Sequence, residues 1–201
     1  METFLWIVAI LVVVYIIYDY SSMEESRIKG HKTAQEFNEN EFIEENGISI
    51  TTEYIYENSY FSNNVSLGSA VYYRVIIDDR HKKLYVFDKD HRVGTQYRDI
   101  IGCEIYSDSA VVGGVKRAAV GGILAGDTGA VVGAMTAKPH IMSYKVVIYR
   151  ANISMPTIEL TLIKQKTETR DKNYNAAVDF ARDLLATIKV IVYQNAKEST
   201  T

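Results

Sequence analysis

The sequence predicts an α+β fold in which antiparallel strands precede one amphipathic helix. From Ile48 onward, apolar residues recur with a period of two, which is typical of half-buried strands. The 201 residues include fifteen tyrosines and only two prolines, a composition that favours strands. Near the C-terminus the apolar period lengthens to that of a helix. Together these observations predict a β-rich domain that ends in a helix.

Six segments of the domain show the alternation of strands. The polar turn Asp78–Lys82 separates two of them and predicts a hairpin. The lone cysteine, Cys103, excludes an internal disulfide, and its apolar neighbours Ile101 and Ile105 predict a buried strand position. The predicted strands are Ile48–Tyr56, Ala70–Asp78, Lys83–Asp88, Ile100–Ser107, Ile141–Tyr149 and Thr157–Ile163.

The C-terminal helix is predicted over Tyr174–Asn195. Charged residues fall away from its apolar stripe, so the helix has one face suited to a core. We expect this helix to close a barrel or to cover a sheet. The stripe consists of Ala177, Ala181, Leu184, Leu185, Ile188 and Val192.

The N-terminus predicts a membrane anchor. Residues 4–18 contain neither a charge nor a glycine, and a helix over residues 3–20 is about 27 Å long, enough for a thin bilayer. Arg27, Lys29 and Lys32 follow this span and no basic residue precedes it. The positive-inside rule therefore predicts a single-pass membrane protein with its N-terminus outside and its domain in the cytoplasm.

The chain is expected to divide into four parts. The segment after the anchor is acidic and is interpreted as a solvated spacer, with a helix over Thr33–Glu45 as the alternative. The parts are the transmembrane anchor 1–20, the acidic spacer 21–47, the β-rich domain 48–195 with a glycine-rich insertion at 110–138, and the tail 196–201.

Small residues recur every four positions through the glycine-rich insertion. Glycine costs up to about 1 kcal/mol per helical position relative to alanine, so the spacing indicates close packing of two backbones. If the insertion begins and ends at one rim of the domain, a helical hairpin turning at Gly126–Gly129 closes it and a single rod does not. The residues expected to pack are Gly121, Gly122, Ala125, Gly126, Gly129, Gly133 and Ala137.

Three basic residues flank the base of this predicted hairpin. Lys116, Arg117 and Lys138 are expected to lie at the membrane surface, where each basic residue contributes about 1 kcal/mol. Asp127 at the tip opposes deep insertion, since a charge near the bilayer centre costs about 3 kcal/mol. We therefore expect surface association, or packing on a second protein chain, in preference to insertion.

Antiparallel strands followed by one helix resemble a pleckstrin-homology-like (PH-like) domain. Lys83–Phe87, Tyr97–Ile101 and the run Gly121–Gly133 resemble small bacterial membrane-tethered proteins whose PH-like domain is interrupted by a glycine-rich segment. The resemblance covers residues 48–195 and implies a PH-like β-barrel or sheet with a binding or scaffolding role. It brings no phosphoinositide site, because the basic residues of the Asp78–Lys83 loop are mixed with acidic ones.

The motifs that carry chemistry are incomplete. Gly121–Thr128 departs from the phosphate-binding loop because Asp127 stands where the lysine must be. Asp127–Ala130 matches the D-T-G-A of retroviral-type aspartic proteases, but its flanks are rich in glycine and alanine and not strand-like. The histidines lack metal-ligand spacing, and a net charge of -3 argues against nucleic-acid binding. No cofactor or metal is expected.

The sequence therefore predicts a non-enzymatic, membrane-anchored binding or scaffolding protein that acts through a PH-like domain and a glycine-rich hairpin. Its expected partners are the membrane, through residues 3–20, and a second copy or another protein, through the hairpin. Two alternatives remain open. One is a membrane-perturbing effector that assembles through the hairpin, and the other is a hydrolase centred on Asp127.

Overall fold

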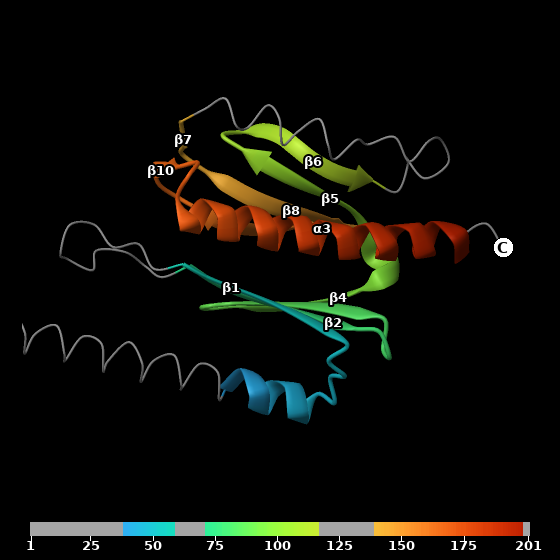
Figure 1. Cartoon of the computed structure of the whole chain (residues 1–201). Coiled ribbons are helices and arrows are strands. Elements are labelled where there is room, and N and C mark those ends of the chain that lie inside the picture. The colour runs from blue at the N-terminus through green and yellow to red at the C-terminus, as the bar shows by residue number, and fades with distance from the viewer. Residues whose placement is uncertain (1–37, 59–70, 117–138, 199–201) are drawn as a thin grey trace, which may run out of the picture. The chain divides into compact units, whose positions relative to one another are not determined.

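The computed structural model describes residues 38–58, 71–116 and 139–198, and the chain separates into two units, residues 1–48 and 49–201 (Figure 1). The second unit contains every labelled strand and the long C-terminal helix. Each unit is considered by itself below.

In the first unit, residues 38–45 are helical. Its last helical residue is Glu45, and the chain then turns at Gly47, whose φ of 59° lies in the left-handed region that glycine adopts at least cost. Its N–H donates to the carbonyl of Glu44 at 3.1 Å, and the Ile48 N–H donates to Ile43 at 3.0 Å. This pair of bonds is a Schellman cap. The alternative expectation of a helix ending at Glu45 is therefore confirmed for its C-terminal half, and residues 33–37 lie outside the described residues.

The second unit is built from two four-stranded antiparallel sheets. The first has the order β1-β2-β3-β4 and the second β6-β5-β8-β9. The first sheet contains β1 (Thr52–Asn58), β2 (Val71–Asp78), β3 (Lys83–Asp88) and β4 (Arg92–Gln96). The 3-10 helix η1 (Tyr97–Asp99) leads to the second, which contains β5 (Ile100–Ser107), β6 (Ala110–Lys116), β8 (Tyr144–Arg150) and β9 (Thr157–Ile163). β7 (His140–Ile141) pairs with β10 (Thr167–Glu168), and α3 (Lys172–Glu198) follows.

The alternating side chains of both sheets and one side of α3 form a single core. Cys103 and Ile105 of β5 are buried there, which confirms the expected position of the cysteine. α3 contacts strands of both sheets and lies along them in Figure 1. The whole predicted stripe of α3 is buried, namely Ala177, Ala181, Leu184, Leu185, Ile188 and Val192.

Side chains, and not a backbone ladder, connect the two sheets where β2 approaches β9. The N–H of Thr161 donates to the hydroxyl of Tyr73 at 3.0 Å, and the hydroxyl of Tyr56 donates to the carbonyl of Leu162 at 3.0 Å. Among the described residues no strand pairing joins one sheet to the other. The expected closed barrel is therefore wrong, and the fold is two open sheets with one C-terminal helix.

The predicted membrane topology is also corrected. Within residues 38–58, 71–116 and 139–198, no helix combines the length and the apolar composition needed to cross a bilayer. The predicted single-pass architecture with an outside N-terminus and a cytoplasmic domain is therefore not supported by the structure. α3 is long enough, but charged residues such as Asp179 and Arg182 line its exposed side. The predicted span at residues 3–20 lies outside the described residues.

The path of the chain around the glycine-rich segment differs from the expected one. β5 and β8 are antiparallel neighbours, as expected. However, Ala110–Lys116 is a strand, which brings Lys116 opposite Gly102 at one end of β5. Pro139 lies at the other end of β5. It directly precedes β7, and the residue after β7, Met142, donates its N–H to the carboxylate of Asp108 at 2.7 Å. Ala110, which pairs with Ser107, and Pro139 therefore lie at one rim, as expected for the insertion 110–138, but Ala110–Lys116 form a strand instead of a helix and carry the chain to the opposite end of β5.

Candidate interaction surface

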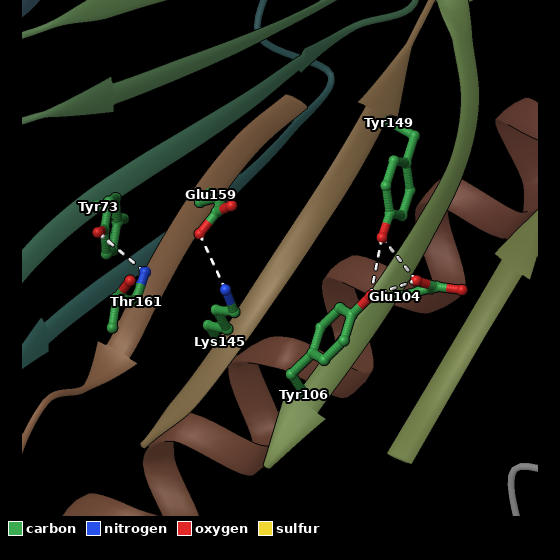
Figure 2. A network of polar contacts seen from close by, with 7 residues as sticks. All are labelled: Tyr73, Glu104, Tyr106, Lys145, Tyr149, Glu159 and Thr161. Carbon is green, nitrogen blue, oxygen red and sulfur yellow. Dashed lines mark hydrogen bonds and ion pairs between the residues drawn. The ribbon is translucent and has the colours of Figure 1, made fainter. Parts of the chain in front are cut away.

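The face of the second sheet that points away from the core carries a set of polar side chains, most of which contact one another. We call this set the polar face (Figure 2). It arises because residues alternate in β5, β8 and β9, so that each apolar core residue is followed by one on the opposite face. The polar face consists of Glu104, Tyr106, Lys145, Tyr149, Glu159 and Thr161.

A carboxylate shared by two phenols forms the centre of the polar face. Oε2 of Glu104 accepts hydrogen bonds from the hydroxyls of Tyr106, at 2.7 Å, and Tyr149, at 2.6 Å. The two hydroxyl oxygens are 2.9 Å apart. Glu104 is buried, so these bonds offset the cost of taking a carboxyl group out of water.

The electrostatics of this cluster keep the phenol of Tyr149 protonated. The hydrogen bond to Glu104 raises the pKa of Tyr149, the bond to Tyr106 adds to this effect, and burial contributes less. A general base or acid works best when its pKa is near the operating pH. The pKa of Tyr149 is shifted away from that range, so its phenol is suited to holding the surface in shape and not to proton transfer.

Lys145 extends the network toward β9. Its Nζ lies 3.0 Å from Oε2 of Glu159 and 5.4 Å from the centre of the Tyr106 ring. The first contact is an ion pair and the second a cation–π contact, each of which contributes up to about 1 kcal/mol at such an exposed position. The polar face therefore offers aromatic rings, a cation and carboxylates within three neighbouring strands.

Gly114 of β6 makes room for the buried carboxyl group. It pairs with Glu104, and a Cβ at this position would lie 2.9 Å from Cγ of Glu104 and 3.0 Å from the carbonyl oxygen of Cys103. The adjacent Gly113 is different, because a Cβ there would meet its nearest atom, in Leu185, at an ordinary 3.5 Å. Only one of these two glycines is required by packing in the described part of the chain.

Gly114→Ala is therefore expected to lower the free energy of unfolding by about 1–3 kcal/mol, since the new methyl group overlaps a backbone oxygen that cannot move alone. The matched substitution Gly113→Ala adds the same methyl group without an overlap and is expected to change the stability by less than about 1 kcal/mol. Urea denaturation of the full chain measures both. Equal losses for the two variants would contradict the role assigned to Gly114.

The described residues contain little that could perform chemistry. No group of three histidine, cysteine, aspartate or glutamate side chains in residues 38–58, 71–116 and 139–198 is placed to hold a metal ion. Burial raises the pKa of Cys103, which keeps it in the unreactive thiol form. His81 and His91 each pair with an aspartate of their own turn.

The site residues predicted from sequence are for the most part not placed by the structure. Arg117, Asp127 and Lys138 lie outside the described residues. So do the small residues expected to pack, namely Gly121, Gly122, Ala125, Gly126, Gly129, Gly133 and Ala137. Lys116 is described as the last residue of β6.

The polar face was not predicted from the sequence. The one available signal is a lone carboxylate, Glu104, within the apolar strand Ile100–Ser107. Its partner Tyr149 is 45 positions further along the chain. Only the pairing of β5 with β8 brings the two together, and periodicity carries no information on that pairing.

The order of elements places the protein in a structural class. A first antiparallel sheet, a second antiparallel sheet and a C-terminal helix along the core are the features of a PH-like domain. Residues 57–164, more than half of the 201-residue chain, match the family described as "Glycine zipper containing PH domain". The chain belongs to this family, which confirms the resemblance to a PH-like domain with a glycine zipper. Neither the curated proteins nor the solved structures yielded a match.

Proposed function

We propose that this protein is a scaffold whose glycine zipper holds two copies of the chain together. A PH-like domain with a glycine zipper is a non-enzymatic type of binding or scaffolding module, and family membership is the observation that supports the proposal most directly. Small residues at every fourth position allow two backbones to approach closely, which larger side chains prevent.

The attachment of the glycine-rich segment supports this role. On its N-terminal side β6 is paired with β5, and on its C-terminal side the carbonyl of Pro139 accepts the Thr169 N–H at 3.2 Å. Both attachment points thus belong to the hydrogen-bonded framework of the domain. A binding segment fixed at both ends loses less conformational entropy on association than a free tail.

The proposal is tested by enlarging the zipper. Gly122→Leu and Gly133→Leu place bulky side chains at positions where small residues recur every four residues, and they are expected to weaken self-association at least about tenfold, which corresponds to about 1.4 kcal/mol. Val131→Leu lies outside this spacing and serves as the control. Sedimentation velocity of the full chain measures association, and circular dichroism checks that each variant folds. Unchanged association in both leucine variants would contradict the proposal.

A further inference from the structure

We propose that the exposed side of α3 is a self-association surface, on which α3 of a second copy of the chain packs antiparallel. Six exposed residues form a seam along this side, with spacings that alternate between four and three positions. Such spacing repeats about every 3.5 residues on average, which keeps a seam facing a partner helix. The seam consists of Asp179, Asp183, Ala186, Val190, Tyr193 and Lys197. This contact involves a different element from the glycine zipper and does not rest on the function proposed above.

The centre of the seam is apolar, although α3 already buries its opposite stripe in the core. Val190 is 55% exposed and Tyr193 is 50% exposed. Ala186, one turn before Val190, is exposed as well. A helix that buries one stripe ordinarily carries polar residues on its other side. The centre of the seam is therefore a surface that gains from being covered by a second helix.

The charge changes sign along the seam. Asp179 and Asp183 lie toward its N-terminal end, and Lys197 lies at its C-terminal end. Asp179 accepts a hydrogen bond from Arg182 of the same helix at 3.0 Å, but exposed pairs of this kind contribute little stability and are readily exchanged. Two parallel copies of α3 would set like charges opposite each other at both ends. Antiparallel copies set the acidic end of each helix against the basic end of the other.

The seam is complementary to itself in one antiparallel register. Its spacings read the same in both directions, so a two-fold axis at the level of Ile188 brings every seam residue opposite another one. The facing pairs are Asp179 with Lys197, Asp183 with Tyr193, and Ala186 with Val190. The first pair is oppositely charged, the second joins a carboxylate to a phenol, and the third packs a small side chain against a branched one. The two-fold axis repeats each pair, and the contact closes as a dimer. This match in charge, polarity and size selects a second copy of the chain as the partner.

Reversing the outer pair tests the register. Asp179→Lys sets two lysines opposite each other at both ends of the seam, and Lys197→Asp sets two aspartates there. Each is expected to weaken dimerisation at least about tenfold at low salt, because the two-fold axis repeats the repulsion. The double variant Asp179→Lys with Lys197→Asp restores opposite charges and is expected to regain the wild-type dissociation constant to within about threefold.

Asp90→Lys is the matched control, since it makes the same change of charge in the exposed turn after β3. Sedimentation equilibrium of the full-length variants measures the dissociation constants, and circular dichroism checks that each variant folds.

Disulfide formation provides the second measurement. A mixture of Ala186→Cys and Val190→Cys is expected to form a crosslinked dimer faster than either variant alone, because only the mixture sets two cysteines in one facing pair. The native Cys103 is buried and does not compete.

A wild type that stays monomeric up to about 1 mM, or a double charge variant that dimerises as weakly as the single ones, would overturn the inference. Equal rates of crosslinking in the mixture and in the separate variants would overturn the register. If Gly122→Leu and Gly133→Leu abolish association while Asp179→Lys and Lys197→Asp do not, the zipper proposal stands and the α3 contact is refuted. Weakening by the charge variants alone, with recovery in the double variant, supports the α3 contact and contradicts the zipper proposal.

Discussion

Leu184→Asp is expected to lower the free energy of unfolding of the second unit by more than about 4 kcal/mol. Leu184 lies at the middle of α3, is inaccessible to solvent and belongs to the core shared by both sheets. An aspartate there must either bury an unpaired charge or take up a proton at a large cost, and such substitutions are among the few that exceed about 4 kcal/mol. Because typical domains are stable by only about 5–15 kcal/mol, a loss of this size consumes a large part of the stability of the fold.

Two further variants keep this prediction measurable. Leu184→Ala removes the same packing without adding a charge and is expected to cost about 2–5 kcal/mol. Asp183→Ala changes the neighbouring exposed residue and is expected to have little effect. Thermal unfolding followed by circular dichroism compares all three with the wild type. Similar, small shifts for Leu184→Ala and Asp183→Ala would mean that α3 is not docked on the sheets.

Local patterns were sufficient for the elements that bury one face. β3, β5 and β9 coincide with the predicted Lys83–Asp88, Ile100–Ser107 and Thr157–Ile163. In each, residues of the core recur mostly at every second position, so the sequence itself records which face packs on the core. The stripe of α3 was predictable for the same reason, at the helical period.

The missed elements depend on contacts between distant residues. β6 contains Gly113 and Gly114, which disfavour an isolated strand, and it forms because β5 supplies a partner. The hairpin between β5 and β6 places Asp108 and Ser109 at φ values of 48° and 72°, a conformation for which glycine and asparagine are the usual residues. Because β6 was predicted to be part of a helical insertion, the return of the chain along β5 to the level of Gly102 was not expected.

The separation of the strands into two open sheets was likewise not predictable from the sequence. A closed barrel and two open sheets require the same alternation in each strand, so the sequence does not distinguish them. The difference lies in how the sheets meet, through hydroxyl groups such as those of Tyr56 and Tyr73 instead of a backbone ladder. The fifteen tyrosines of the chain were interpreted as a sign of strand propensity. Several of them instead provide the hydrogen bonds that connect strands and sheets.

Asp78→Asn is expected to lower the free energy of unfolding by about 2–3 kcal/mol at neutral pH. The carboxyl group of Asp78 is inaccessible to solvent at the end of β2. Oδ1 accepts the His81 N–H at 3.0 Å, and Oδ2 lies 3.1 Å from the Ser49 nitrogen and 2.7 Å from Nδ1 of His81. An asparagine has one acceptor oxygen in place of two, so its NH₂ group must face a buried donor.

The pH dependence of this loss identifies its cause. Burial raises the pKa of Asp78, but the hydrogen bonds from His81 and Ser49 together outweigh burial and hold the pKa below the ordinary 3.8. The unfolded chain therefore takes up the proton first as the pH falls. The stabilisation is complete above about pH 3.8 and is lost as the pH drops through the folded-state pKa.

Urea unfolding from pH 7 to pH 2 tests this cause. The difference in free energy of unfolding between wild type and Asp78→Asn should narrow below about pH 4. Asp90→Asn, in the exposed turn after β3, should differ little from wild type at any pH. A constant gap for Asp78→Asn would assign its effect to packing and refute the role of the charge.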